Sequence, residues 1–184
     1  MWSEKVQRQF DIAQAGNDLV ENVMHAPYNK LLNTLFPVDT DFAVIPNFQQ
    51  INSTKSADYF MTFEIFLENK PVFVLSLQRE KDFSVRSKRT AADDQLRLRL
   101  GDLIDVCPLP VLHGVSAFGT KLRFYSITKE GLISPEYIPA ASPLYVTDTA
   151  PVGRWNHDIL AAEGEAAFRR VVQAIMTECA QLSQ

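Results

Sequence analysis

The sequence has little of what several common classes of protein require. Its two cysteines, Cys107 and Cys179, are too few for a disulfide framework and form no C-x-x-C pair, so we expect buried thiols. The seven glycines are scattered and build neither a G-x-x-x-x-G-K nor a G-x-G-x-x-G loop. The three histidines are far apart, and none belongs to an H-E-x-x-H pattern. The sequence therefore offers no glycine-rich phosphate loop and no local zinc motif.

Long apolar runs are also missing. No stretch approaches the roughly 20 apolar residues that span a bilayer. The opening MWSEKVQRQF lacks an apolar segment of the signal-peptide kind. We therefore expect an intracellular protein, cytoplasmic or nuclear, with no membrane partner. With 184 residues, of which 46% are hydrophobic and 10% aromatic, the chain is long enough for one domain (residues 1–184) with a core of its own.

Charge is unevenly distributed along the chain. The net charge of −4 argues against a protein that coats DNA, because non-specific affinity comes from neutralised phosphates. The stretch from Arg79 to Arg99 is nevertheless the most basic part of the chain. If the protein binds nucleic acid, we expect the contacts to come from this stretch. The candidate residues are Arg79, Lys81, Arg86, Lys88 and Arg89.

The stretch 58–80 predicts a β-hairpin, because two runs rich in aromatic and β-branched residues flank a short polar turn. Side chains alternate between the two faces of a strand, so Ser76, Gln78 and Glu80 share one side of the second strand. Asp58, at the open end of the hairpin, should lie near one of these three residues. The register of the strands decides which one.

Other segments predict further elements around this hairpin. Arg89, Asp93 and Arg97 follow one another at i+4, which predicts either a surface salt-bridge ladder or a site facing the hairpin, and Gln95 leaves the same two alternatives open. His113 lies in an apolar run and is interpreted as a core histidine. The expected order is helices in 1–36, a strand meander in 42–80, a core helix in 87–105, strands in 111–128, a proline-rich wrapping loop in 129–155 and a helix in 156–182.

An acidic residue at the start of one strand, facing two polar residues at i and i+2 on the next, is typical of the PD-(D/E)XK nuclease superfamily. The chain resembles in particular a group of fungal PD-(D/E)XK-like domains over most of its length. The resemblance implies an α/β fold with a restriction-endonuclease-like core, a mixed and mostly antiparallel sheet of four to five strands with helices on both faces. The stretches that carry it are HAPYNKLLNTLFP preceded by Glu21, ADYFMTF, VFVLSLQ, RTAADDQLRLRL, PVLHGVSAFGTKLRFYS and DTAPVGRWNHDIL.

The sequence departs from the family at the residues that perform hydrolysis. In the family, the first Asp and the Glu of Glu-x-Lys bind a divalent metal, and the Lys orients the attacking water. Here Ser76-Leu77-Gln78 stands in that place. A serine hydroxyl is a poor ligand for a hard dication, and an uncharged amide can neither deprotonate water nor neutralise phosphate. The resemblance thus implies a degenerate site at Asp58, Ser76, Gln78 and Gln95.

Three functions remain open at this point, and with them the question of whether the chain is an enzyme. The first is a degenerate nuclease-like domain that binds nucleic acid or protein without a cofactor. The second is an active nuclease whose Mg²⁺ or Mn²⁺ is held by Glu21, Asp58 and Glu80. The third is a small-molecule-binding or dimerisation scaffold on the same fold.

Overall fold

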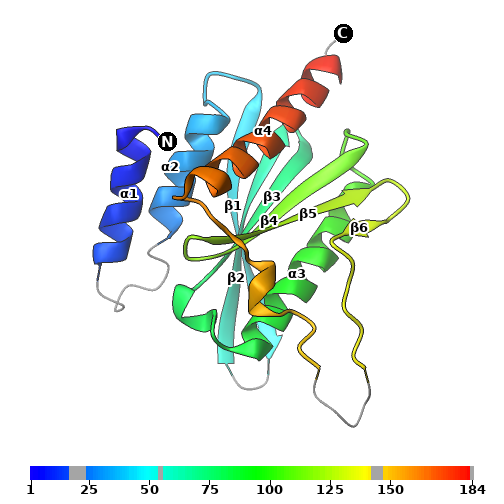
Figure 1. The fold of residues 1–184 in the computed structure, drawn as a ribbon. Helices are drawn as coiled ribbons and strands as arrows, with labels where there is room; N and C mark the ends of the chain where they lie inside the picture. Colours follow the sequence, from blue (N-terminus) through cyan, green and yellow to red (C-terminus); the bar gives the residue numbers. More distant parts are fainter. Residues whose placement is uncertain (17–23, 54–55, 142–146, 183–184) are drawn as a thin grey trace.

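The structure is a computed structural model that describes residues 1–16, 24–53, 56–141 and 147–182; for residues 49–53 and 56–60 it describes the backbone alone. Its course is shown in Figure 1. The elements in chain order are α1 (Glu4–Ala15), α2 (His25–Leu35), β1 (Phe42–Ser53), β2 (Ser56–Leu67), β3 (Lys70–Gln78), η1 (Glu80–Asp82), α3 (Arg86–Ile104), β4 (Val111–Phe118), β5 (Lys121–Thr128), β6 (Ile133–Ser134), η2 (Val152–Arg154), β7 (His157–Asp158) and α4 (Ala162–Leu182).

The strands form one mixed sheet of seven strands in the order β1-β2-β3-β4-β5-β6, with β7 also paired to β5. The first three strands are an antiparallel meander. After β3 the chain passes through α3 and returns as β4, which is parallel to β3, whereas β5 is antiparallel to β4. The predicted α/β class is confirmed. The expected count of four to five strands is wrong, because the two-residue strands β6 and β7 add to β5.

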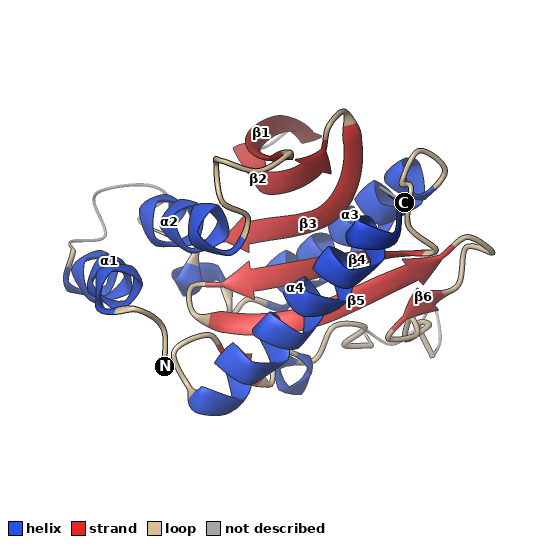
Figure 2. Cartoon of the chain, turned by 90° about the horizontal axis from the view of Figure 1, so that it is seen from above, coloured by secondary structure: helices blue, strands red, loops and turns tan. Residues whose placement is uncertain are grey.

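Helices cover both faces of the sheet. Leu100 of α3 lies directly on β4, since a Cβ at Gly114 would lie 3.1 Å from its Cδ1 atom. On the other face, Phe73 of β3 meets Phe36, which follows α2, and Phe168 of α4, at ring-centroid distances of 6.3 and 5.9 Å. Helix α1 packs on α2, and both views show the two helices side by side (Figures 1 and 2). The sheet is therefore the middle layer of three.

The central strand was well predicted. β3 is apolar on both faces, and its residues from Pro71 to Leu77 are buried between β2 and β4. Aromatic and aliphatic side chains fill the α2 and α4 side, whereas the α3 side carries polar residues among the apolar ones. No helix in the described part of the chain is both long and apolar enough to cross a membrane.

The segment predicted to wrap the surface is held against α3. Arg97 Nη2 donates to the carbonyl of Pro135 at 2.7 Å, and Arg89 Nε donates to the carbonyl of Ala150 at 2.9 Å. The C-terminal helix begins at Ala162 rather than at 156. Its expected first turn is instead β7, in which Asp158 accepts hydrogen bonds from the Thr120 hydroxyl and the Lys121 ammonium, both at 3.1 Å.

Candidate functional site

A row of polar side chains crosses the sheet beneath α3. Strand pairing sets one residue of each of five strands opposite the next, and each of them points to the α3 face. Four of the five are almost completely buried, an unusual place for polar groups. The row consists of Asn47, Thr62, Ser76, Ser116 and Arg123.

Ser76 lies at the centre of the row, and Gln78 lies two residues further along the same strand. Ser76 is completely buried, and Gln78 is half-buried at the end of β3. The side-chain amide of Gln78 donates to Ser76 Oγ at 3.2 Å. The two residues are thus joined by a hydrogen bond, and neither carries a charge that would hold a dication or polarise water.

Among the side chains of β2 that the structure describes, Glu64 carries a buried carboxylate on this face, next to the row. Arg99 of α3 donates to both carboxylate oxygens of Glu64, through Nε at 2.7 Å and Nη2 at 2.9 Å. This bidentate pair raises the pKa of Arg99, and Thr62 and Asn47 add longer hydrogen bonds to Glu64 at 3.3 and 3.4 Å. Glu64 is thus neutralised by the protein itself and is poorly placed to bind a metal.

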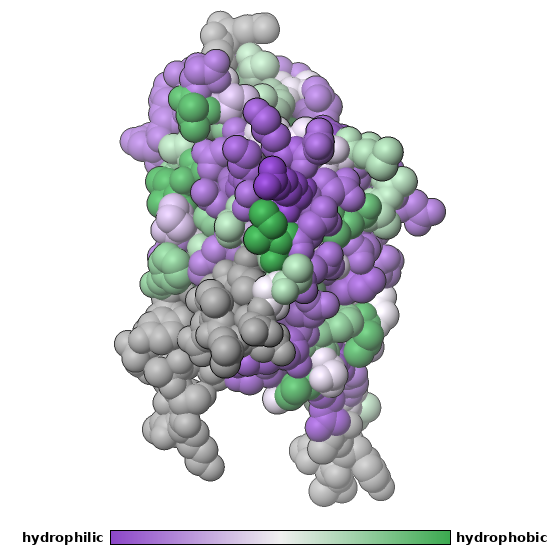
Figure 3. Space-filling model, turned by 90° about the vertical axis from the view of Figure 1, so that its left-hand side faces the viewer, coloured by the Kyte–Doolittle hydropathy of each residue, from purple (hydrophilic) through white to green (hydrophobic). Residues whose placement is uncertain are grey.

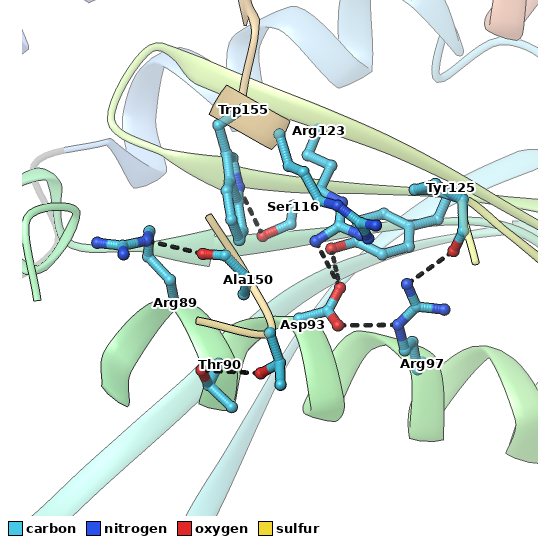
Figure 4. A network of polar contacts seen from close by, with 12 residues as sticks. Arg89, Thr90, Asp93, Arg97, Ser116, Arg123, Tyr125, Ala150 and Trp155 are labelled. Carbon is cyan, nitrogen blue, oxygen red and sulfur yellow. Dashed lines mark hydrogen bonds and ion pairs between the residues drawn. The ribbon is translucent and has the colours of Figure 1, made fainter. Parts of the chain in front are cut away.

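The other end of the row is a buried charge cluster (Figure 4). Asp93 of α3 is 1% exposed and lies 2.7 Å from Arg123 Nη1 of β5. It also accepts hydrogen bonds from the Tyr125 hydroxyl at 2.7 Å and from Arg97 Nε at 2.9 Å. The Asp93–Arg97 part of the predicted ladder is present, but it lies inside the protein, and Arg97 continues to the wrapping segment.

Arg123 is the most tightly enclosed cation of this cluster. Its guanidinium lies over the rings of Tyr125 and Trp155, at 4.6 and 5.3 Å from their centroids. The contact to Asp93 has the distance of an ion pair, but none of the three guanidinium nitrogens makes a hydrogen bond of good geometry with the described residues. Burial lowers the pKa of Arg123, and burial followed by the negative charge of Asp93 raises that of Tyr125.

The register of β2 places Thr62, not Asp58, opposite Ser76. The β2–β3 pairs begin at Met61, and the backbone of Asp58 pairs with Ile51 of β1. Asp58 and Thr62 are four positions apart, roughly 13 Å along an extended strand. The side chain of Asp58, and the whole of Glu21, lie outside the part of the chain that the structure describes.

Glu80, the third predicted metal ligand, has left the strand. It is exposed and begins η1, so it does not continue the face of Ser76 and Gln78 as predicted. Its side chain lies against the β4–β5 turn, since a Cβ on Gly119 would come within 2.9 Å of Glu80 Cδ. That turn is on the side of β3 away from β2. Among the described residues no three acidic, histidine or cysteine side chains gather as a metal site.

The five predicted nucleic-acid contacts differ in burial and in their contacts with the rest of the protein. Arg89 is buried and binds the Phe83 and Ala150 carbonyls and Asp148, so its prediction as a surface contact is wrong. Arg79 is half-buried and pairs with Asp82 at 2.8 Å. The remaining residues, Lys81, Arg86 and Lys88, follow the end of β3, the first two exposed and the third half-buried.

Gln95 lies on the flank of α3 that faces β2. It is half-buried one helical turn before Arg99, which reaches Glu64 of that strand. Thr62, Glu64, Arg99, Ser116 and Arg123 were not predicted as site residues. The alternation of the strand residues is visible in the sequence, but only the strand order reveals that Thr62, Ser116 and Arg123 belong to one row.

A pocket of about 390 Å³ opens at the end of the sheet where β3 ends and β5 begins. The η1–α3 connection, the start of β5, the stretch from η2 to β7 and the first turn of α4 form its walls. It adjoins the end of β3, because Gly119, next to the start of β5, donates its N–H to the Gln78 carbonyl at 3.4 Å.

Comparison with protein-family models, with curated proteins and with solved structures finds no match for this chain.

Proposed function

We propose that this chain is a nuclease-like domain that binds nucleic acid without cleaving it. The resemblance to the fungal PD-(D/E)XK-like domains implies helices, a three-stranded meander, a core helix and further strands in one mixed sheet. The observed order from β1 through α3 to β4 is compatible with that core and supports the proposal. Such an order is shared by folds with other functions, so the argument depends on the residues of the site.

The observation that carries the proposal is the hydrogen bond from Gln78 to Ser76. These residues stand where a nuclease of this superfamily carries a carboxylate and an ammonium, and here they are two neutral groups bonded to each other. The neighbouring carboxylate, Glu64, is occupied by Arg99. Among the described side chains at this site, a phosphodiester would meet neither a free metal ligand nor a group able to activate water.

Local charge favours a nucleic acid as the partner. The connection from β3 to α3 carries the exposed Lys81 and Arg86, and it ends at the N-terminus of α3, where the helix dipole attracts phosphate. By contrast, the face of the molecule on the α1 side is largely hydrophilic, with hydrophobic residues only in small, separate groups (Figure 3). Wide apolar patches are typical of protein-binding surfaces, and this face has none among the atoms shown.

The active-nuclease alternative has less support. It needs Glu80 beside Asp58, but Glu80 lies against the β4–β5 turn, on the far side of β3. Lys81 is exposed in η1 and would have to replace the lost lysine from outside the strand.

The test is to incubate the protein with labelled single-stranded and double-stranded DNA and RNA, with Mg²⁺ or Mn²⁺, and to measure binding and cleavage together. We expect salt-dependent binding and intact substrate. Reversing two charges, in the double variant Lys81→Glu with Arg86→Glu, should make the negative slope of log K against log salt shallower by about 2. The reason is that roughly one phosphate contact is lost per residue.

The matched control is Lys70→Glu, an exposed lysine at the opposite end of β3, which should leave binding unchanged. Absence of any nucleic-acid binding would falsify the proposal. Cleavage that is lost in both Asp58→Ala and Glu80→Ala, with the fold unchanged, would establish the active nuclease instead.

A further inference from the structure

The pocket beside the end of β3 has a composition that points to a particular class of ligand. Its volume of about 390 Å³ lies in the range of small-molecule sites. One wall is the aromatic pair Phe83 and Trp155, whose rings pack edge to face at 6.2 Å. The first turn of α4, with Glu163, also lines the pocket. An aromatic lining of this kind suits a planar ligand of modest size.

The polar groups of the pocket are only partly used by the protein. Asp158 is occupied by Thr120, by Lys121 and by the Leu160 N–H at 3.0 Å. The Nδ1 atom of His157 is buried without a hydrogen-bond partner among the described residues. A buried ring nitrogen without a hydrogen bond costs free energy.

The charge of the pocket disfavours an anion. Lys121 is already paired with Asp158, and the exposed carboxylate of Glu163 has no ion-pair partner among the residues that the structure describes. The group that enters should therefore carry no negative charge and should offer a donor to a carboxylate. An aromatic base with an exocyclic amino group meets these conditions, because carboxylates accept hydrogen bonds from such amino groups.

The rigidity of the site supports binding without rearrangement. Any side chain at Gly164 would collide with the carbonyl oxygen of Asp158, so the first turn of α4 rests directly on β7. The Ala161 N–H also donates to that carbonyl, at 3.0 Å, and Ile159 is tied to Thr120 at 2.9 Å. Three elements of the wall are thus fixed relative to one another before a ligand arrives.

We infer that this pocket binds a nucleobase bearing an exocyclic amino group, with Glu163 as the acceptor. The base can come from a free nucleoside or from a single-stranded polynucleotide held by the neighbouring basic connection. The inference thus goes beyond the proposed function, because the first source does not require a polynucleotide partner.

Cytidine and uridine are the sharpest probes, since they have the same size and differ in an amino group against a carbonyl. Calorimetric titration of the protein should give an affinity for cytidine about tenfold higher than for uridine, the usual effect of one hydrogen bond to a charged acceptor. Glu163→Gln, which preserves shape, should abolish this preference. The matched control is Glu130→Gln, an exposed acid just beyond the other end of β5, which should retain it.

The same titrations with single-stranded oligo-C and oligo-U distinguish the two sources. A preference that depends on Glu163 and appears only with the oligonucleotides supports the inference with a polynucleotide as ligand, and one that appears with nucleosides supports the free form. If neither probe pair shows such a preference, the inference is wrong.

The two proposals fail separately. If oligonucleotide binding depends on Lys81 and Arg86 but not on Glu163, the proposed function stands and the inferred base pocket is wrong. If nucleosides bind in a manner that depends on Glu163 and no oligonucleotide binds, the inferred pocket stands and the proposed function is wrong. Circular-dichroism melting of each variant confirms that the fold is unchanged, as expected for exposed side chains.

Discussion

The buried pair of Asp93 and Arg123 should respond asymmetrically to mutation. Asp93 has three partners, Arg123, Tyr125 and Arg97, whereas the described surroundings of Arg123 provide Asp93 as its only ion-pair partner. Replacing Asp93 therefore leaves a guanidinium, 2% exposed, without any counter-charge. Replacing Arg123 leaves a carboxylate that is still held by Arg97 and Tyr125.

The magnitudes follow from this difference. Breaking a buried pair so that one charge is uncompensated costs about 3 to 5 kcal/mol, the value we expect for Asp93→Leu. For Arg123→Met, which keeps the length of the side chain, we expect about 1 to 2 kcal/mol, because the remaining carboxylate of Asp93 keeps its hydrogen bonds to Tyr125 and Arg97. The double variant should lose less than the sum, by about 2 kcal/mol, because it removes both charges together.

The assay is urea unfolding followed by circular dichroism, with the free energy of unfolding taken from the linear extrapolation. A loss of 5 kcal/mol could unfold a domain of ordinary stability, so Asp93→Asn serves as a milder variant that retains an acceptor for Tyr125. The reasoning is refuted if Arg123→Met is as destabilising as Asp93→Leu, or if the two single losses are additive.

Three further predictions follow from the geometry. Arg99→Met should cost about 1 to 3 kcal/mol in urea unfolding by leaving the buried Glu64 unpaired, with Arg86→Met as the exposed control; no loss would contradict the assigned pair. Burial lowers the pKa of His113, so the unfolded chain takes up its proton first, and stability should fall as pH drops below about 6.5, less so in His113→Gln; an equal fall in both proteins would contradict this. Burial also raises the pKa of Cys179 to about 11, so it should react with a thiol reagent only after denaturation; rapid labelling of the native protein would contradict its burial.

Local patterns predicted those elements whose signal lies within one segment. β3 was recognised as a central strand because it is apolar on both faces, and α3 was placed within one residue of its bounds by its apolar stripe. The start of α4 was predicted six residues too early, since the choice between a helical turn and a strand at Asp158 depends on Thr120 and Lys121, which are distant in sequence.

The site was less predictable because its residues converge from different strands. Arg123 lies in a segment that was predicted only as a strand, and its burial depends on Asp93 of α3 and on Trp155, which are distant in sequence. Arg89 was predicted as a nucleic-acid contact because it lies in the most basic stretch of the chain, but its contacts with Ala150 and Asp148 bury it. Ser76 and Gln78 lie on one face of β3 as predicted and are joined by a hydrogen bond. The residue opposite Ser76 on β2 is Thr62.

The polar row beneath α3 also restricts how this chain can assemble its sheet. A slip of one strand by one residue would turn its polar row residue toward the apolar face of the sheet, which carries Phe73 and Phe168, and would bring apolar side chains under α3. Misaligned sheets are therefore penalised twice, once for each face. The row gives the protein a means of rejecting wrong alignments while it folds, whatever ligand the finished domain binds.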